Sequence, residues 1–425
     1  MNTKIRLGVV GGGQVGQATL EDLAATNGVD MVGLAEPEEA LRRIHQKSGI
    51  AVYPTLEALL QQARPDAVKI CTPNSWHARH ALVCLEAGVH VLCEKPLATG
   101  SDDARRIVQA ARRSAKVFMV NFEYRRSRMF ARIKQLLDAG EIGQARNFWF
   151  YESRPGFHGP EGGWRFKKGD GGLFGEKLCH YLDLVLWFGD GEFRRVQVRH
   201  GPNTLPHYEI PDHAMAFFEM RDGHTFTLAT HHGIAADPPL FAQVWGSPTN
   251  LRVCPRVGHA CGFRIAGTKG AIISDDWRQS IAINRLVRDH SGQRGGWRME
   301  HERTEDFSKH QHPENVHNQA GMLACFLDQC RKGEPLIDPS PRHLLAVMAA
   351  VEAAERSAEH QTPELIAPER ELAPGAAGDF TTKDTKNTNA TDGSREAAKS
   401  AKEIRMTDME MVEVRFPWPS RLRVR

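Results

Sequence analysis

The chain has 425 residues, of which 41% are hydrophobic and 25% are charged, and its formal net charge at pH 7 is +3. This balance is typical of a soluble globular protein of two or three domains, and it lacks the basic excess of a dedicated nucleic-acid binder. No run of about 20 apolar residues is present, so no membrane span is expected, and the N-terminus lacks the apolar region of a signal peptide. Eight cysteines without a C-x-x-C motif are typical of reduced thiols and predict a cytoplasmic protein.

Residues 1–123 alternate short apolar segments with helical patterns of about 10 to 15 residues. We expect strands at 5–10, 29–35, 67–71, 89–93 and 117–120, and helices at 14–25, 38–47, 75–87 and 102–114. Strands that are apolar throughout and alternate with helices form a parallel sheet that is buried on both faces. This part of the chain therefore predicts an α/β domain with a doubly wound parallel sheet.

The first strand runs into a glycine-rich turn. Its sequence, Gly11-Gly12-Gly13-Gln14-Val15-Gly16, matches the pattern G-x-G-x-x-G between a strand and a helix. In that pattern Gly11 allows the tight turn, Gly13 lets a pyrophosphate approach the backbone, and Gly16 lets the helix pack on the strand. The N–H groups of Gln14 and Val15 open the helix and can bind phosphate oxygens. The turn predicts a dinucleotide site in a Rossmann domain, although a glycine turn without a cofactor would have the same local pattern.

Glu36 stands at the end of the second predicted strand, about 20 residues after the last glycine of the turn. A carboxylate at this position can accept a hydrogen bond from the 2′-hydroxyl of an adenosine ribose. The same negative charge would repel a 2′-phosphate. Glu36 therefore predicts NAD rather than NADP as the cofactor.

Residues 124–368 follow a different pattern, in which two helices precede a long run of strands and two further helices. The expected helices lie at 127–139, 173–188, 314–331 and 341–360, and the expected strands at 195–198, 214–220, 225–230, 240–245 and 262–286, with a hairpin turn at Gly267-Thr268-Lys269-Gly270. Apolar residues alternate with polar or small ones along these strands, which favours an α+β domain with a large, mostly antiparallel open sheet. Residues 371–425 are of low complexity and poor in apolar residues, so they predict a disordered tail.

Two clusters outside the glycine turn carry groups suited to catalysis. Glu94-Lys95-Pro96 follows a predicted parallel strand, at the sheet edge where α/β proteins bind their ligands. Lys95 could donate a hydrogen bond to a substrate hydroxyl there, and a surface Glu–Lys pair in a turn is the alternative.

Glu176, His180 and Asp183 form the second cluster, with the i, i+4, i+7 spacing of one helix face. A histidine flanked by carboxylates can act as a general base near neutral pH. A capped amphipathic helix that contains a histidine for packing alone is the alternative.

Several motifs occur in one order along residues 4–368. They are the glycine turn, Thr72-Pro73-Asn74-Ser75-Trp76-His77, Glu94-Lys95-Pro96, Trp164-Arg165, the Gly-Gly…His180-x-x-Asp183 helix and the hairpin turn at 267–270. Together they resemble the Gfo/Idh/MocA family, named for glucose–fructose oxidoreductase and inositol 2-dehydrogenase. The resemblance implies an NAD-binding Rossmann domain at 1–123 and a second domain at 124–368 that binds the substrate. It also implies a homo-oligomer, either a dimer or a tetramer, that assembles through the second sheet.

The resemblance implies roles for individual residues. Lys95 would be the catalytic lysine beside the nicotinamide, and His180 would take the hydroxyl proton while a hydride moves to the nicotinamide. Glu176 stands where many members carry an aspartate, and Asp183 would orient the site or bind substrate. The cofactor would contact Gly11, Gly13, Gln14, Val15, Gly16, Glu36, Thr72, Pro73, Asn74, His77, Glu94 and Lys95. The substrate would contact Lys95, Arg125, Trp164, Arg165, Lys177, His180 and Asp183.

The function implied by this resemblance is that of an NAD-dependent dehydrogenase acting on a sugar, a polyol, an inositol or a related cyclic alcohol. The alternatives are a glycosidase that keeps and recycles its NAD, and a non-catalytic regulator that senses NAD or a sugar. Glu176 and Lys177 depart from the polyol-binding pattern of the family, so the sequence leaves the substrate open. His301, His310, His312 and His317 match no zinc template, and we expect neither a metal nor a nucleic-acid or membrane partner.

Overall fold

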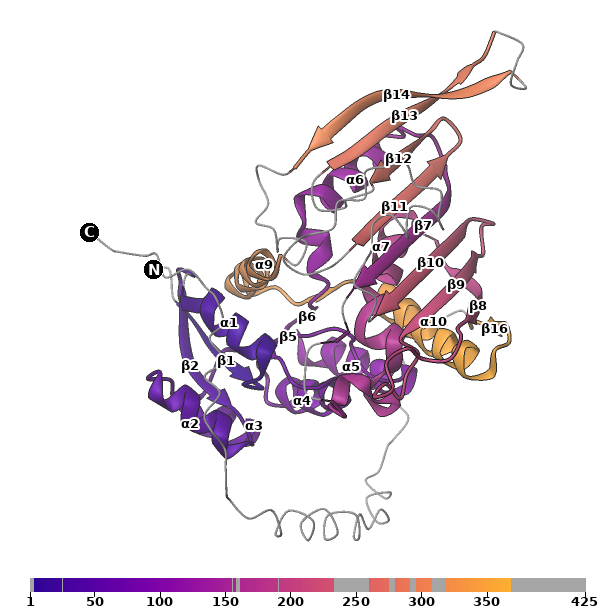
Figure 1. Ribbon diagram of the computed structural model, residues 1–425. Coiled ribbons are helices and arrows are strands. Elements are labelled where there is room, and N and C mark those ends of the chain that lie inside the picture. The colour runs from indigo at the N-terminus through magenta and orange to yellow at the C-terminus, as the bar shows by residue number, and fades with distance from the viewer. Residues whose placement is uncertain are drawn as a thin grey trace, which may run out of the picture. The chain divides into compact units, whose positions relative to one another are not determined.

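The computed structural model describes residues 4–367, with gaps at 25, 155, 158–160, 190, 233–259, 275–279, 291–295 and 308–317. The strand expected at 240–245 and the tail at 371–425 lie outside the described residues. Residues 1–371 belong to one compact unit, which contains two sheets (Figure 1). None of the helices in the described ranges is both long enough and apolar enough to cross a membrane.

The first sheet has seven strands, in the order β15-β6-β5-β4-β1-β2-β3, and every neighbouring pair is parallel. Its strands are β1 (Ile5–Val10), β2 (Val29–Ala35), β3 (Val52–Tyr53), β4 (Ala67–Ile70), β5 (His90–Cys93), β6 (Val117–Val120) and β15 (Leu336–Asp338). The helices between them are α1 (Gln14–Ala24), α2 (Glu39–Lys47), α3 (Leu56–Ala63), α4 (Asn74–Glu86) and α5 (Ser101–Ser114). The predicted doubly wound sheet is confirmed, and the structure adds β3 and α3, which no sequence pattern had indicated.

Both faces of this sheet are buried because its strands are apolar at successive positions. In β6, Phe118 and Val120 belong to the core on one face, whereas Val117 and Met119 belong to the core on the other. Successive residues of a strand point to opposite faces, so an uninterrupted apolar run is needed when both faces are covered.

The first sheet is completed by a segment from far along the chain. Helix α9 (Gln319–Lys332) packs Leu323 and Phe326 into the same core as Leu7 and Val9 of β1, and it lies beside α1 (Figure 1). Strand β15 then pairs with β6 in parallel. The sequence pattern places this segment in the second domain, because a three-residue strand carries no pattern of its own. The domain limits at 123 and 368 stay a prediction, but β15 belongs to the first sheet and α9 packs on its core.

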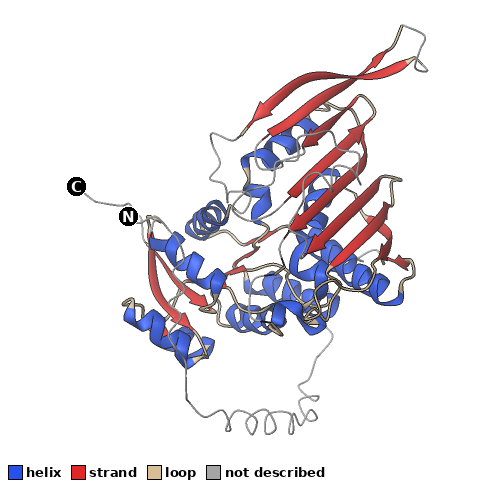
Figure 2. Ribbon diagram, viewed as in Figure 1, coloured by secondary structure: helices blue, strands red, loops and turns tan. Residues whose placement is uncertain are grey.

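The second sheet has nine strands, in the order β14-β13-β12-β11-β7-β10-β9-β8-β16. Its strands are β7 (Ala145–Arg154), β8 (Phe193–Arg199), β9 (His213–Met220), β10 (Thr225–His232), β11 (Ala260–Gly267), β12 (Gly270–Ser274), β13 (Ser280–Arg288), β14 (Trp297–Asp306) and β16 (Glu364–Leu365). Only β7 and β10 pair in parallel among these strands, which confirms the mostly antiparallel sheet (Figure 2). The predicted hairpin turn at 267–270 joins β11 to β12.

Three helices cover one face of the second sheet: α6 (Arg128–Asp138), α7 (Cys179–Gly189) and α10 (Pro341–His360). Phe263, Phe150 and Val198 share this face through the strand register. Phe130 of α6 contacts Phe263, Tyr181 of α7 contacts Phe150, and Ser357 of α10 accepts a hydrogen bond from the Val198 N–H. Each helix is therefore anchored to the buried face by at least one specific contact.

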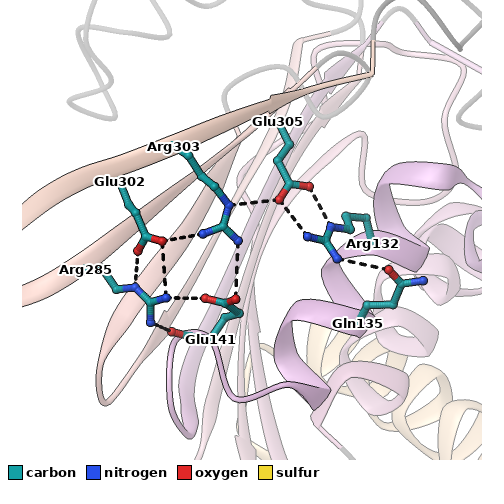
Figure 3. A network of polar contacts seen from close by, with 7 residues as sticks. All are labelled: Arg132, Gln135, Glu141, Arg285, Glu302, Arg303 and Glu305. Carbon is teal, nitrogen blue, oxygen red and sulfur yellow. Dashed lines mark hydrogen bonds and ion pairs between the residues drawn. The ribbon is translucent and has the colours of Figure 1, made fainter.

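Charged side chains tie the outer hairpin, β13 and β14, to α6 and to the turn that follows α6 (Figure 3). Arg132 of α6 donates two hydrogen bonds to the Glu305 carboxylate, of 2.8 and 3.1 Å. Arg303 contacts the same carboxylate at 3.3 Å, and Arg285 donates to both Glu141 and Glu302. Because these side chains are partly exposed, salt screens them, and the network orients the hairpin more than it stabilises the fold.

The helix expected at 173–188 is not regular. Residues Phe174–Leu178 form a π-helical turn, and α7 follows it. The turn that holds Glu176 thus has more residues than an α-helical turn, and the shared face of Glu176, His180 and Asp183 stays a prediction.

A carboxylate from α10 caps the start of this irregular helix. Glu355 accepts a hydrogen bond of 2.5 Å from the Phe174 N–H. Gly172 has φ +67, and a Cβ at this position would lie 2.3 Å from the Glu355 carboxylate. Burial raises the pKa of Glu355 to about 7, against the opposing effect of the backbone N–H groups of Phe174 and Gly175. The beginning of the helix that carries Glu176 and His180 thus depends on an acid that titrates near neutral pH.

The pKa of Glu355 predicts how stability changes with pH. The unfolded chain ionises this carboxyl at its ordinary, lower pKa. The contribution of the protonated Glu355 carboxyl to the free energy of unfolding is therefore fully present in acid and is lost as the pH rises through about 7. Glu355→Gln cannot ionise, so it should gain stability relative to the parent between pH 5 and pH 8, by at most about 3 kcal/mol. Urea unfolding at several pH values measures the difference, and Glu86→Gln, on the exposed end of α4, controls for the lost charge. A difference that stays constant across this range would contradict the prediction.

Candidate active site

A cavity of about 590 Å³ follows the carboxyl edge of the first sheet and reaches the loop that precedes the π-helical turn. Of the predicted site residues, its lining includes Gly11, Gly13, Gln14, Val15, Glu36, Thr72, Pro73, Asn74, His77, Glu94, Lys95, Trp164, Arg165 and Glu176. Five others, Gly16, Arg125, Lys177, His180 and Asp183, are not part of that lining. The structure thus brings together most of the predicted cofactor residues and one end of the predicted substrate site.

The glycines of the turn differ in their surroundings. Gly11 has φ +95, and a Cβ there would lie 2.8 Å from the Cys71 carbonyl. A Cβ on Gly16 would lie 2.0 Å from the Gly11 carbonyl oxygen, whereas a Cβ on Gly13 would meet no atom within 4 Å. Gly11 and Gly16 therefore permit close backbone packing, and Gly13 borders open space beside the first turn of α1. That combination fits a pyrophosphate at the helix N-terminus.

Glu36 lies at the end of β2 and is 5% exposed. Its carboxylate accepts hydrogen bonds of 2.6 Å from the Gly12 N–H and 2.8 Å from the Glu38 N–H. The carboxylate also lines the cavity next to the glycine turn. The Glu36 carboxylate is therefore already fixed in position at this end of the cavity.

Lys95 and Glu176 form an ion pair at the other end of the cavity. The Lys95 ammonium donates to the Glu176 backbone oxygen at 2.5 Å and lies 3.8 Å from its carboxylate. Arg165 and Asn74 donate to the two carboxylate oxygens of Glu176, at 2.9 and 3.0 Å. Burial alone would raise the pKa of Glu176, but Lys95, Arg165 and Asn74 stabilise the carboxylate and lower it.

Lys95 follows β5, and its peptide bond to Pro96 is cis. Burial disfavours the charged form of Lys95, but the surrounding carboxylates, led by Glu176, outweigh burial and raise the pKa of the ammonium group. Lys95 is thus a hydrogen-bond donor at neutral pH and not a base.

His77 connects two loops at the same edge. Its ring nitrogens lie 2.7 Å from the Pro96 carbonyl oxygen and 3.0 Å from the Thr72 carbonyl oxygen. Burial lowers the pKa of His77, so the ring is neutral and donates to one of these oxygens at a time. The contact holds the Lys95–Pro96 turn against the start of α4.

His180 is buried and stacks on Tyr124, with ring centroids 4.2 Å apart. Its Nε2 atom lies 3.8 Å from the Glu123 carboxylate. Lys177 donates to the Tyr124 hydroxyl at 2.8 Å and lies 3.5 Å from the Glu152 carboxylate, and burial lowers the pKa of Lys177 against the pull of that carboxylate. Lys177, His180 and the carboxylates of Glu123 and Glu152 therefore form a second polar cluster around Tyr124.

Asp183 is fully buried and forms ion pairs away from the cavity lining. Arg125 donates to both of its oxygens, at 2.8 and 2.6 Å, and His343 lies 2.9 Å from the same carboxylate. Burial would raise the pKa of Asp183, but Arg125 and His343 lower it. Arg125 and Asp183, two of the predicted substrate contacts, are thus paired with each other, between the 3-10 turn at Glu123–Arg126 and α7.

Four residues of these clusters are absent from the sites predicted from the sequence: Glu123, Tyr124, Glu152 and His343. Glu123 and Tyr124 lie three and four residues after the end of β6, at the same sheet edge as Lys95, so the rule that ligands bind at this edge could have found them. Glu152 and His343 carried no local signal.

Among the described residues, no group of three or more His, Cys, Asp or Glu could hold a metal ion. His301 lies in β14, and His310, His312 and His317 lie outside the described residues.

Comparisons with known proteins match both parts of the chain. A family model described as "Oxidoreductase family, NAD-binding Rossmann fold" matches residues 5–122, and the Gfo/Idh/MocA C-terminal domain model matches residues 130–273. Inositol 2-dehydrogenase 3 of Saccharopolyspora erythraea is 27% identical over 282 residues, which cover 65% of this chain and 81% of that protein. Levoglucosan dehydrogenase of Pseudarthrobacter phenanthrenivorans is 29% identical over 321 residues, which cover 68% and 78%.

A solved structure of levoglucosan dehydrogenase, in complex with NADH and levoglucosan, shares the fold with a TM-score of 0.67. It is 20% identical, and the match covers 86% of this chain and 100% of the other. The open space at Gly13, the fixed carboxylate of Glu36 and the two family models agree with one another. The chain belongs to the Gfo/Idh/MocA family and is an NAD-binding oxidoreductase.

Proposed function

We propose that the protein is a dehydrogenase that oxidises one hydroxyl of a sugar, a polyol, an inositol or a related cyclic alcohol, with NAD as the hydride acceptor. The observation that carries this proposal is the charged Lys95 at one end of the dinucleotide cavity, held by Glu176. The relatives named above, an inositol dehydrogenase and a levoglucosan dehydrogenase, support the substrate class. Bound NAD would supply the carbon that accepts the hydride.

The residues of the chain would then manage the proton and the orientation of the substrate. Lys95 would donate a hydrogen bond to the reacting hydroxyl oxygen and favour its alkoxide character. His180 would accept the hydroxyl proton, and the Glu123 carboxylate, 3.8 Å from its Nε2 atom, would stabilise the resulting imidazolium. The hydroxyl thus loses a proton to His180 and its carbon loses a hydride, which balances a two-electron oxidation.

The remaining predicted residues would shape the substrate end. Trp164 and Arg165 line the cavity beside Glu176, and the Arg165 guanidinium lies 4.5 Å from the Trp164 ring centroid. We assign sugar contacts to these two residues. The polar groups of Lys177, Arg125 and Asp183 bind other side chains of the protein in the structure. Their contacts with a substrate therefore stay predictions.

Neither alternative function is favoured by an observation. Nothing in the comparisons supports a glycosidase that recycles its NAD, and the retention of both Lys95 and His180 argues against a regulator without turnover.

The structure contains free thiols at Cys71, Cys84, Cys93, Cys179, Cys325 and Cys330. Free thiols support the proposal that the protein works in the reducing cytoplasm.

Substitution of the two proposed catalytic residues tests this function. Lys95→Met and His180→Asn should each lower the turnover number by about 10²- to 10⁴-fold, the range typical of a lost general acid–base group. NADH formation at 340 nm, measured against a panel of sugars, polyols and inositols, gives the rates. Lys168→Met and His360→Asn, at exposed positions, serve as matched controls. Parent-like turnover in both active-site variants would contradict the assignment.

The charge of Glu36 predicts the choice between cofactors. The parent should bind NAD at least about tenfold more tightly than NADP, because a 2′-phosphate would meet a fixed carboxylate. Glu36→Gln keeps an acceptor for the Gly12 N–H but removes the charge. This variant should therefore reduce the difference between the NAD and NADP affinities, mainly by improving NADP binding. Calorimetric titration with both cofactors measures the ratio. An unchanged ratio in Glu36→Gln would show that the charge does not decide the preference.

We also propose that the protein forms a homo-oligomer, a dimer or a tetramer, through the open face of the second sheet. Met215 and Phe217 of β9 are 46% and 43% exposed, and strand alternation places both side chains opposite the helix-covered face. The double variant Met215→Lys, Phe217→Lys should sediment as a smaller species than the parent in analytical ultracentrifugation. Ile44→Lys, at an exposed apolar position on α2, should leave the mass unchanged. A monomeric parent would refute the proposal.

A further inference from the structure

His45 is a buried histidine in α2 that no cofactor motif includes. It is 3% exposed, and its Nε2 atom lies 2.9 Å from the backbone carbonyl oxygen of Gly12, in the middle of the glycine turn. A carbonyl oxygen can only accept a hydrogen bond, so Nε2 carries the hydrogen. A contact from the second helix therefore holds the turn between the first strand and the first helix.

The peptide groups on both sides of Gly12 are bonded to side chains. The Gly12 N–H donates to the Glu36 carboxylate at 2.6 Å, and the Gly12 carbonyl oxygen accepts from His45. A Cβ on Gly12 would lie 2.8 Å from His45 Nε2 and 3.2 Å from the nearer Glu36 carboxylate oxygen. The two side chains thus enclose Gly12 from the side of β2 and α2, and they leave no room for a larger residue.

The orientation of the Gly12–Gly13 peptide group follows from this contact. In a trans peptide the C=O and the N–H are coplanar and point in opposite directions. With the Gly12 carbonyl directed at His45, the Gly13 N–H points away from His45. Gly13 lines the cavity, and a Cβ built on it meets no atom within 4 Å. The contact therefore turns the Gly13 N–H to the side of the peptide opposite His45, and Gly13 itself borders the cavity beside the first turn of α1.

We propose that His45 is a positioning residue of the cofactor site, which fixes the Gly12–Gly13 peptide so that the Gly13 N–H faces the pyrophosphate of NAD. Three consecutive glycines have wide conformational freedom, and ordering them on binding would reduce affinity. A turn that is already ordered by His45 and Glu36 avoids part of that loss. His45 itself contacts no part of the cofactor in this proposal. It rests on the NAD binding of the family, and it is independent of the substrate.

The test compares a variant that lacks the donor with one that restores it. His45→Leu removes the N–H and should weaken NAD binding by about five- to tenfold, the effect of one lost hydrogen bond. His45→Gln returns an amide N–H at a similar reach and should bind within about twofold of the parent. Isothermal titration of the full chain with NAD measures both, without any substrate. Ile44→Ala, at the exposed neighbouring position of α2, is the matched control.

Thermal unfolding without NAD separates positioning from general stability. Melting temperatures of His45→Leu and His45→Gln that lie close together, with weaker NAD binding in the leucine variant alone, would support the proposal. Parent-like affinity in His45→Leu would overturn it, and so would equally weak binding in both variants, because the donor would then be irrelevant. If His45→Leu does not fold, His45→Met replaces it in the same comparison. Failure here would leave the proposed dehydrogenase untouched, and a failed substrate panel would leave this result untouched.

Discussion

The buried carboxylate of Glu176 is the contact on which the arrangement of the site depends. It accepts hydrogen bonds from Asn74 at the start of α4 and from Arg165, which lies in the segment before the π-helical turn. It also attracts the ammonium group of Lys95, which follows β5. A carboxylate removed from water needs such partners, because an uncompensated buried charge is costly. The three partners come from separate segments, so one side chain fixes the loops of the first sheet against the helix of the second. Lys95 and the residues around it keep their positions through this shared anion.

The features that sequence patterns predict well are those set by short-range geometry. The glycine turn, Glu36 and Lys95 each occupy a defined place in a strand–turn–helix unit, and a parallel strand directs its carboxyl end to the ligand edge. The strand pattern of the second domain likewise reflects one buried face. Strand β7 was not predicted, because its apolar residues do not alternate clearly with polar ones. For these parts, local spacing and the period of apolar residues contain the necessary information.

Other features depend on contacts between distant segments and have no local pattern. His45 and Glu355 lie inside ordinary helices, and only the folded chain shows that one reaches Gly12 and the other caps Phe174. The π-helical turn at 174–178 departs from the spacing of a regular helix, and no local pattern in the sequence predicts it. Tyr124 and Glu123 differ from these, because their position after β6 was a usable signal.

The late return of the chain to the first sheet has a consequence for how the protein is made. Strand β15 occupies the edge next to β6, and α9 covers Leu7 and Val9, yet both follow every strand of the second sheet except β16. During synthesis the N-terminal core therefore stays open on one face until residue 338 has emerged from the ribosome. Strands β7 to β14 thus lie between β6 and β15 in the chain, and the first sheet is completed only after these eight strands of the second sheet have been translated.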